Sequence, residues 1–489
     1  MALMGATHAS SLAPACSPHT FDTISLFVGE ILSISAVPLH KVPGETLTSN
    51  FDVFQVTNLD VCQVNVTYTH PGQNDLVNIT SWLPLQKDQW NGRFLATDGG
   101  GYASGSGAVD LVAPASLGYA SASTDGGHTP DTEWAYGGVF YDEAIEYSYF
   151  SGCSTGGRQG HTIAQRYPTQ FDGILATAPA INWASFILFQ YWPQLVMSLL
   201  GEYPSACELD AITEAAVQAC DGLDGTVDQI ISAPGLCDFD PFTMDGKVAS
   251  CPSSSSNFTT QVKISHAAAI VAKATWTGPS TVDGEFSWYG LNPDAPLSSG
   301  LAGTQYNSDQ SNCTAGAPFS IPADWMNKFV LKRPIASGSA GAAALTNLTH
   351  GEYDTILRQS VSQFESILSA NDPDLTDLRN SDGKMLSWHG LSDQLIPPNG
   401  TCNYYDRMLE NDPSAADYNR FFPVPGVQHC DGGKGIFPEN MLDVLVDWVE
   451  NGVVLERVDV SDGERTGVLC PYPRHLFKIG EKSDSEIYV

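Results

Sequence analysis

Basic residues are scarce in this chain. Its 489 residues include 22 Lys and Arg against 55 Asp and Glu, which gives a formal net charge of −33. A surface of this sign repels nucleic acid and anionic membranes, so neither is an expected partner. The acidic excess suits an enzyme that works in acid, where part of the carboxylates are protonated, but it can equally serve solubility alone.

Long apolar runs are missing as well. No stretch of 18 or more apolar residues occurs in the sequence, so a transmembrane helix is not expected. Residues 1–9 have neither a basic start nor a long apolar core, and they do not have the pattern of a signal peptide.

Two features nevertheless favour a secreted protein. The chain has 11 cysteines, which is many for a reducing compartment. It also has Asn-x-Ser/Thr sequons at Asn65, Asn78, Asn257, Asn312, Asn347 and Asn399. We therefore expect a secreted glycoprotein, with a leader that is missing from this sequence or atypical.

The most informative motif is Gly152-Cys153-Ser154-Thr155-Gly156, which follows an apolar run and precedes a helix-like segment. G-x-S-x-G between a strand and a helix is the nucleophile elbow of an α/β-hydrolase, whose glycines permit a sharp turn that exposes the serine. Ser154 is therefore the candidate nucleophile. The N–H of Thr155, at the helix N-terminus, is a candidate oxyanion donor.

The surrounding pattern agrees with this fold class. Strands are predicted at 61–68, 77–83, 93–97, 117–124 and 171–176, and a strand with a following helix at 147–166. Their alternation with helical segments predicts an α/β fold with a mainly parallel sheet. Residues 182–385 break the pattern and predict an inserted lid domain, which leaves 1–181 and 386–489 for the α/β-hydrolase core.

A serine nucleophile needs a base, and the base needs an orienting acid; in this fold they follow in the order Ser, Asp or Glu, His. Asp393 ends the segment 388–393, an apolar strand that runs into a loop, so it lies where the C-terminal end of a strand would present a carboxylate. His429 lies in a glycine-rich loop before a strongly amphipathic segment, 439–451. Ser154, Asp393 and His429 thus have the type, order and context of a catalytic triad.

Alternatives remain open at this point. His475 also follows the acid, but it lies in a tail of basic and proline residues. His389 precedes Asp393, which is the wrong order for the base. A structural glycine turn with a core histidine would also produce the pattern. Cys153 and Cys430 adjoin the serine and the histidine, so they either form a disulfide that ties the two loops together or are buried thiols.

With these residues the chain resembles the tannase and feruloyl esterase family. The Cys-Ser, Asp and His-Cys pattern matches Cys153-Ser154, Asp393 and His429-Cys430. The segments 149–160, 178–183, 208–213 and 221–225 match as well, and within the family the chain is most similar to the fungal feruloyl esterase B branch. The resemblance implies an α/β-hydrolase core with a lid, and esterase activity on phenolic acid esters such as plant cell-wall ferulates or gallates.

The resemblance also implies further site residues. Gly100, in the loop 99–101, would supply the second oxyanion donor. A structural Ca²⁺ in the lid would be held by Asp221, Asp224 and Asp228 with the backbone carbonyls of Thr226 and Ile230, oxygen ligands that suit this cation. The disulfides implied are Cys153–Cys430, Cys220–Cys237 and Cys16–Cys62. Dimeric relatives make a homodimer an expectation by analogy.

Three features depart from the family pattern. The crossover between Asp125 and Tyr147 is short, where relatives have a long helix. The tail 482–489 lacks the cysteine expected to bond with Cys470. The remaining cysteines are Cys207, Cys251, Cys313, Cys402 and Cys470, an odd number, so at least one of them stays outside the disulfides if the three implied pairs form.

A secreted serine esterase of the feruloyl type is therefore the first expectation. A tannase is the alternative with the same machinery and a different acyl pocket. An inactive phenolic-binding protein on the same fold is the alternative from another functional class.

Overall fold

The structure is a computed structural model that describes residues 16–21, 29–45, 55–71, 76–97, 105, 108–126, 139–140, 143–144, 146–252, 259–306, 313–333, 341, 343–453, 456–478 and 484–488. The chain divides into two compact units. The first comprises Met1–Thr177, Leu375–Leu386 and Glu439–Val454, and the second comprises Ala178–Asp374, Ser387–Pro438 and Leu455–Val489. The lid bounds of 182–385 stay a prediction.

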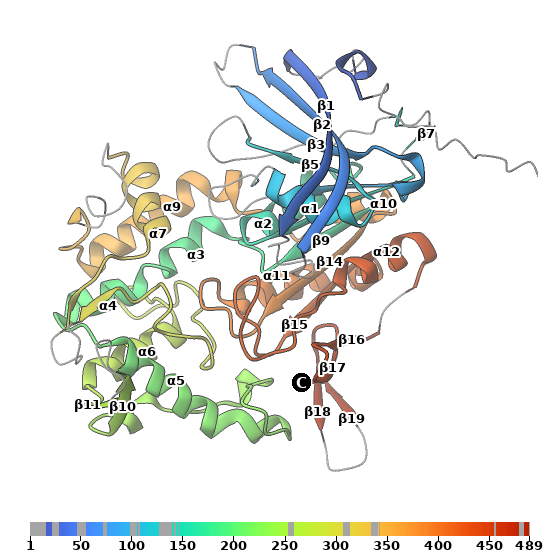
Figure 1. The fold of residues 1–489 in the computed structure, drawn as a ribbon. Coiled ribbons are helices and arrows are strands. Elements are labelled where there is room, and N and C mark those ends of the chain that lie inside the picture. The colour runs from blue at the N-terminus through green and yellow to red at the C-terminus, as the bar shows by residue number, and fades with distance from the viewer. Residues whose placement is uncertain are drawn as a thin grey trace, which may run out of the picture. The chain divides into compact units, whose positions relative to one another are not determined.

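Seven strands of the first unit lie in one sheet in the order β1, β2, β3, β5, β4, β8, β9. Of these, β1, β2, β3, β5 and β9 are labelled in Figure 1. Their bounds are β1 Glu30–Glu45, β2 Gln55–Thr69, β3 Val77–Pro84, β4 Arg93–Thr97, β5 Ala120–Thr124, β8 Tyr147–Cys153 and β9 Gly173–Thr177. Two more strands, β14 (Lys384–Gly390) and β15 (Asn419–Val424), follow in the strand order. β14 begins in the first unit and ends in the second.

The α/β prediction is confirmed, with one difference in the sheet. β4 pairs parallel with β5 and β8, and β8 with β9, as expected. β1, β2, β3 and β5 pair antiparallel instead. Connection length accounts for part of this difference. β4 is joined to β5 through α1 (Ala108–Ser116), and β8 to β9 through α2 (Thr155–Arg166), whereas only residues 70–76 separate β2 from β3, too few for a parallel crossover.

The amphipathic segment near the C-terminus forms α12 (Met441–Asn451), which packs on β9. Its apolar face buries Met441, Leu442, Leu445, Val446 and Trp448. A Cβ added at Gly173 in β9 would lie 2.6 Å from the Tyr149 ring and 3.2 Å from Leu445. The strand and the helix therefore pack at a distance that only glycine permits at this position.

The second unit is mainly helical, with small antiparallel hairpins. Its helices are α3 Trp183–Phe189, α4 Trp192–Leu200, α5 Ala206–Cys220, α6 His266–Thr277, α7 Ser320–Asp324, a π-helix at Trp325–Val330, α9 His350–Leu368 and α11 Pro398–Asn411. The hairpins are β10–β11 (Val248–Pro252, Thr259–Lys263), β12–β13 (Thr304–Tyr306, Cys313–Ala315), β16–β17 (Val458–Ser461, Thr466–Leu469) and β18–β19 (Arg474–Lys478, Asp484–Tyr488).

The longer helices begin at strong capping signals. Ser205 and Glu208 form a capping box at the start of α5, and Thr349 and Glu352 form one at α9. Such boxes satisfy backbone N–H groups that the first helical turn leaves unbonded. Short 3-10 turns stand at Pro18–Phe21, Lys87–Gln89, Asp221–Asp224, Pro234–Leu236, Pro241–Met244 and Ala415–Asp417, and α10 (Thr376–Asn380) lies in the first unit.

The short crossover lies mostly outside the described residues. Between Gly126 and β8 the structure describes the two-residue strands β6 (Val139–Phe140) and β7 (Glu143–Ala144) and the residue Glu146, whereas residues 127–138, 141–142 and 145 lie outside it. In the part of the chain that the structure describes, no helix is long and apolar enough to cross a membrane.

One polar cluster joins the sheet of the first unit to α12. Arg93 of β4 donates two hydrogen bonds to Glu450, from Nε to Oε1 (2.7 Å) and from Nη2 to Oε2 (2.8 Å). The Tyr149 hydroxyl donates to the same carboxylate at 2.9 Å. The hydrogen bonds from Arg93 hold the pKa of Glu450 below its ordinary value of 4.5.

We expect Glu450→Gln to lower the free energy of unfolding near neutral pH by about 1–2 kcal/mol, between the values for surface and buried ion pairs. Because the folded-state pKa of Glu450 is depressed, its contribution is complete above the unfolded-state pKa and is lost as the pH falls through the folded-state value. Urea unfolding at neutral and acid pH should therefore show a smaller difference in acid. Asp459→Asn, which removes an exposed partner of Arg457, should change stability by less than about 0.5 kcal/mol; an equal effect of both variants would contradict this.

Candidate active site

The predicted nucleophile lies in a strained turn between β8 and α2. Ser154 has a φ of 63° and a ψ of −117°, a conformation that L-residues rarely adopt. Its backbone N–H donates to the carbonyl of Thr177 at the end of β9, at 3.0 Å. The turn thus has the sharp strand-to-helix geometry of a nucleophile elbow.

The glycines of the motif permit this turn by bringing two backbones together. A Cβ at Gly152 would lie 2.7 Å from the carbonyl carbon of Gly156, so no larger residue fits there without displacement. One turn later, a Cβ at Gly160 would lie 3.0 Å from the Cβ of Ala176 and 3.1 Å from Cγ2 of Ile174 in β9. The motif G-x-S-x-G therefore corresponds to close packing of α2 against the strands.

The structure describes one of the two predicted oxyanion donors. Thr155 is the first residue of α2 and is buried. N–H groups of a first helical turn have no partner within the helix, which is the property an oxyanion donor needs. Gly100 lies outside the described residues.

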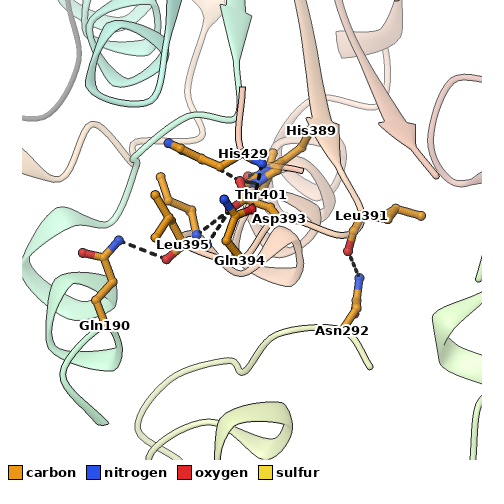
Figure 2. A network of polar contacts seen from close by, with 10 residues as sticks. Gln190, Asn292, His389, Leu391, Asp393, Gln394, Leu395, Thr401 and His429 are labelled. Carbon is orange, nitrogen blue, oxygen red and sulfur yellow. Dashed lines mark hydrogen bonds and ion pairs between the residues drawn. The ribbon is translucent and has the colours of Figure 1, made fainter. Parts of the chain in front are cut away.

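The predicted acid is held by four hydrogen bonds in the loop after β14 (Figure 2). One oxygen of Asp393, Oδ1, accepts from the backbone N–H groups of Leu395 and Ile396, each at 2.8 Å. The other, Oδ2, lies 2.7 Å from Nδ1 of His429 and 3.0 Å from Nε2 of His389. The carboxylate is fully buried, and the structure thus brings the predicted acid and base together.

Burial alone would raise the pKa of Asp393. The charges of the two histidines and their hydrogen bonds outweigh it and hold the pKa well below its ordinary value. Asp393 is therefore an anion in the folded protein over the whole range in which an esterase works.

The loop of His429 is placed by backbone contacts to the acid loop. The Gln394 side-chain oxygen accepts the backbone N–H of His429 at 3.1 Å. Ser392 N–H donates to the Val427 carbonyl at 3.0 Å, and a Cβ at Gly390 would collide with that same carbonyl. The last residue of β14 must therefore be glycine if the two loops are to pack this closely.

Sequence reasoning missed the residues that surround Asp393. The sequence order excludes His389 as the base and indicates no other role for it, yet His389 is a second imidazole on the acid, and its Nδ1 lies 2.9 Å from the Thr401 hydroxyl. Gln190 donates to the Leu395 carbonyl at 3.0 Å, and Asn292 donates to the Leu391 carbonyl at 2.8 Å (Figure 2). The only signal in the sequence is the spacing of His389, four residues before Asp393 at a strand end.

A second buried carboxyl group lies beside the acid loop. The hydroxyl of Ser392 donates to Oδ2 of Asp294 at 2.5 Å. Burial raises the pKa of Asp294 to about 6, although hydrogen bonds from Ser392 and from the backbone lower it in part. This group gains its proton in mildly acidic solution.

The predicted calcium ligands lie together on the loop after α5. Asp221 and Asp224 are buried, and burial together with the neighbouring carboxylates raises the pKa of Asp228. Backbone N–H groups donate to these carboxylates: Asp228 and Gln229 to Asp221, both at 2.9 Å, Thr226 to Asp224 at 2.8 Å, and Ile230 to Asp228 at 3.1 Å. Among the described side chains, no three of His, Cys, Asp or Glu are arranged as metal ligands.

The disulfides include two of the implied pairs. Cys16 is bonded to Cys62, and Cys220 to Cys237, which closes the acidic loop. A third bond, Cys207–Cys251, joins α5 to β10. Cys153 and Cys430 are both disulfide-bonded residues, whereas Cys313, Cys402 and Cys470 carry thiols.

The three triad residues are divided between the two units. Ser154 lies in the first unit, and the Asp393–His429 pair lies in the second. The elbow and the acid–base pair are therefore observed separately, and their combination into a triad stays a prediction. His475, the alternative base, is in β18.

Known proteins resemble this chain over most of its length. The family model described as tannase and feruloyl esterase matches residues 136–486. A relative named "Probable feruloyl esterase" from Arthroderma benhamiae is 36% identical, over 88% of this chain and 86% of the relative. "Tannase" from Aspergillus oryzae is 27% identical, over 99% of this chain and 94% of its own. The solved structure of a tannin acyl hydrolase from Aspergillus niger matches 98% of this chain and 96% of its own, with a TM-score of 0.85 at 25% identity.

The strain at Ser154 gives a prediction that does not depend on activity. At this positive φ, glycine is expected to be less strained than alanine, so Ser154→Gly should be more stable than Ser154→Ala by about 1 kcal/mol. Ser362, exposed inside α9, is the matched control, because in a helix the order reverses and alanine is favoured by about 1 kcal/mol. Thermal melting of the four variants measures both differences. The same order at both positions would contradict a strained elbow.

Proposed function

The chain belongs to the tannase and feruloyl esterase family and is a carboxylic ester hydrolase, and from this premise we propose that it cleaves phenolic acid esters through a serine triad. The observation that carries the proposal is the Asp393–His429 hydrogen bond of 2.7 Å, together with the strained elbow at Ser154. An elbow supplies an exposed hydroxyl, and a buried Asp–His pair supplies a base with a fixed tautomer.

In the proposed reaction, Ser154 Oγ attacks the ester carbonyl carbon while its proton passes to Nε2 of His429. Because Nδ1 donates its hydrogen to Asp393, Nε2 carries the lone pair of the neutral ring. The oxyanion formed is stabilised by the N–H groups of Thr155 and Gly100. His429 then protonates the departing alcohol, and a water molecule activated by the same histidine hydrolyses the acyl-enzyme and restores Ser154.

We further propose that Cys153 and Cys430 are bonded to each other. Both are disulfide-bonded residues, and they adjoin the nucleophile and the base in sequence. A covalent tie at these positions limits how far the base loop can move from the serine, which is a form of preorganisation.

The proposed substrate is a feruloyl ester of plant cell-wall polysaccharide, since the relative that is 36% identical carries the name of a feruloyl esterase. Gallate esters are the second candidate, favoured by the high TM-score with a tannin acyl hydrolase. The two acyl groups need different pockets: gallate requires polar partners for its hydroxyls, while ferulate requires a longer apolar slot.

We also propose secretion and N-glycosylation. The disulfides are typical of oxidising compartments, and the sequon asparagines Asn347 and Asn399 are exposed. Asn78 differs, because its side-chain amide donates to Asp125 at 2.6 Å and its oxygen accepts from Thr67. Asn257 and Asn312 lie outside the described residues.

The experiment compares hydrolysis of methyl ferulate and methyl gallate by the wild type and by Ser154→Ala. We expect turnover to favour ferulate, and the variant to lose on the order of 10⁴-fold or more in kcat while its melting temperature is kept. A preference for gallate would assign the chain to the tannases. Unchanged turnover in a folded Ser154→Ala protein would reject the triad.

The acidic loop supports a structural Ca²⁺ by its donor set. Asp221, Asp224 and Asp228 carry three carboxylates on one short loop, and the first two are buried. Burial and, after it, the charges of Asp224 and Asp221 raise the pKa of Asp228, and a bound divalent cation would offset both effects. The ion would hold the loop that Cys220–Cys237 closes; it has no part in the ester chemistry.

If the loop binds Ca²⁺, chelation by EGTA should lower the melting temperature, and restoring the ion at about 100 times its Kd should return roughly 2.7 kcal/mol of stability. Since the pKa of Asp228 is raised, the affinity should weaken on acidification. Asp224→Asn should abolish the response to EGTA. A melting temperature that changes neither on addition of EGTA nor on addition of Mg²⁺ would contradict a cation site in this loop.

A further inference from the structure

We propose that His389, supported by Thr401, is a positioning residue that fixes the Asp393 carboxylate for His429 and extends the working range of the enzyme toward acid. This inference rests on the proposed function, because it takes Asp393 and His429 as the acid and base of the reaction. It adds two side chains to the triad, one from the strand that carries the acid and one from the helix that follows.

The contacts of His389 indicate that it positions the Asp393 carboxylate. The side chain is completely buried at the end of β14 and lies four residues before the acid. Its Nε2 is 3.0 Å from Oδ2 of Asp393, the same oxygen that His429 contacts at 2.7 Å (Figure 2). The buried carboxylate oxygen is thus shared between two imidazole rings.

The hydrogen-bond chemistry determines the direction of the donation. An ionised carboxylate only accepts, so Nε2 of His389 must carry a hydrogen and donate it to Asp393. The other nitrogen, Nδ1, then accepts from the Thr401 hydroxyl when the ring is neutral, at 2.9 Å. Donation to Nδ1 polarises the ring and makes Nε2–H a better donor, as in other chains of hydrogen bonds.

Thr401 is itself held in place. It is buried in the first turn of α11, where the preceding Gly400 lies against the ring of Trp288: a Cβ at Gly400 would be 3.1 Å from Cζ2 of that ring. The hydroxyl therefore has a fixed position relative to the helix. The sequon Asn399-Gly400-Thr401 places its threonine in this network.

Sharing the carboxylate has a consequence for the base. When Asp393 accepts a hydrogen bond from a second imidazole N–H, the positive end of the His389 N–H dipole partly offsets the negative charge of the carboxylate. The carboxylate then attracts a positive charge on His429 less strongly. We therefore expect the activity of the enzyme to extend further into acid than it would without His389. This is a useful property in a chain with a net charge of −33, whose self-repulsion eases in acid.

Few titratable groups face this network in the described structure. The charges that act on Asp393 are those of His429, from the loop after β15, and His389, from its own strand. Asp294, from the loop after α6, contacts the acid loop through Ser392, and burial raises its pKa to about 6. Leu395, Ile396 and Thr401 contribute uncharged donors only.

The test is the pH profile of kcat/KM and kcat for methyl ferulate in His389→Leu, His389→Gln and Thr401→Val. Leucine removes the donor to Asp393, whereas the amide nitrogen of glutamine can take the place of Nε2. We expect His389→Leu to lower kcat on the order of tenfold with KM nearly unchanged, the cost of one charged hydrogen bond. Its acid limb should move up by about one pH unit. His389→Gln and Thr401→Val should show smaller shifts in the same direction, and Thr401→Ser a still smaller one.

Two controls separate this role from a structural one. His350→Gln alters a half-buried histidine of α9 whose Nε2 bonds the Ser280 carbonyl, and it should leave the acid limb in place. Asp294→Asn removes the other nearby carboxyl group; repeating the His389→Gln comparison in that background should give the same shift. If His389→Gln no longer moves the acid limb in the Asp294→Asn background, the acid limb belongs to Asp294 and the proposal is overturned.

The remaining outcomes are distinguishable. Loss of kcat in His389→Leu and His389→Gln with the acid limb unmoved would mean that His389 has a packing role only, and the proposal fails. If His389→Leu does not fold, His389→Gln and Thr401→Val, with melting temperatures checked, decide the question by their acid limbs. If Ser154→Ala and Asp393→Asn retain full activity, it is the proposed triad that fails rather than this inference alone.

Discussion

The hydrogen bonds to the buried carboxylate of Asp393 determine how the loops of the second unit are arranged at the site. A fully buried charge is costly unless its hydrogen-bonding capacity is filled, and here four donors fill it. Two of these donors are backbone groups, which fix the path of the loop 393–396. The other two are imidazoles from different elements, so the same charge fixes β14 relative to the histidine loop. The requirement to satisfy one buried anion thereby sets the position of the base.

Elements far apart in the sequence supply the rest of the support. Gln190 follows α3 and Asn292 lies in a loop after α6, yet both donate to backbone carbonyls of the acid loop. Gln394 then connects that loop to the backbone of His429. Residues of the predicted lid therefore hold the loop that carries the acid, which explains why Asp393 and His429 belong to the same compact unit as the lid segments.

The sequence predicted the features that depend on local constraints. The elbow follows from glycines at fixed spacing, and its strained φ at Ser154 is what that spacing requires. The parallel strands and α12 followed from apolar periodicity. The antiparallel edge of β1, β2 and β3 was not predicted, because strand direction depends on connection length and pairing rather than on strand pattern. His389 and Thr401 could not be assigned, since their role exists only when the fold brings a second ring onto one oxygen of Asp393.

Side chains of the segment 292–294 also hold the two residues that precede Asp393. Asn292 donates to the carbonyl of Leu391, and the hydroxyl of Ser392 donates to the carboxyl group of Asp294. Removing either partner would leave a polar group without its hydrogen bond in a site from which water is largely excluded, so both contacts favour one path of the chain into the acid. The position of Asp393 therefore depends on a segment that is about 100 residues away in the sequence, and no local pattern around Asp393 could indicate that dependence.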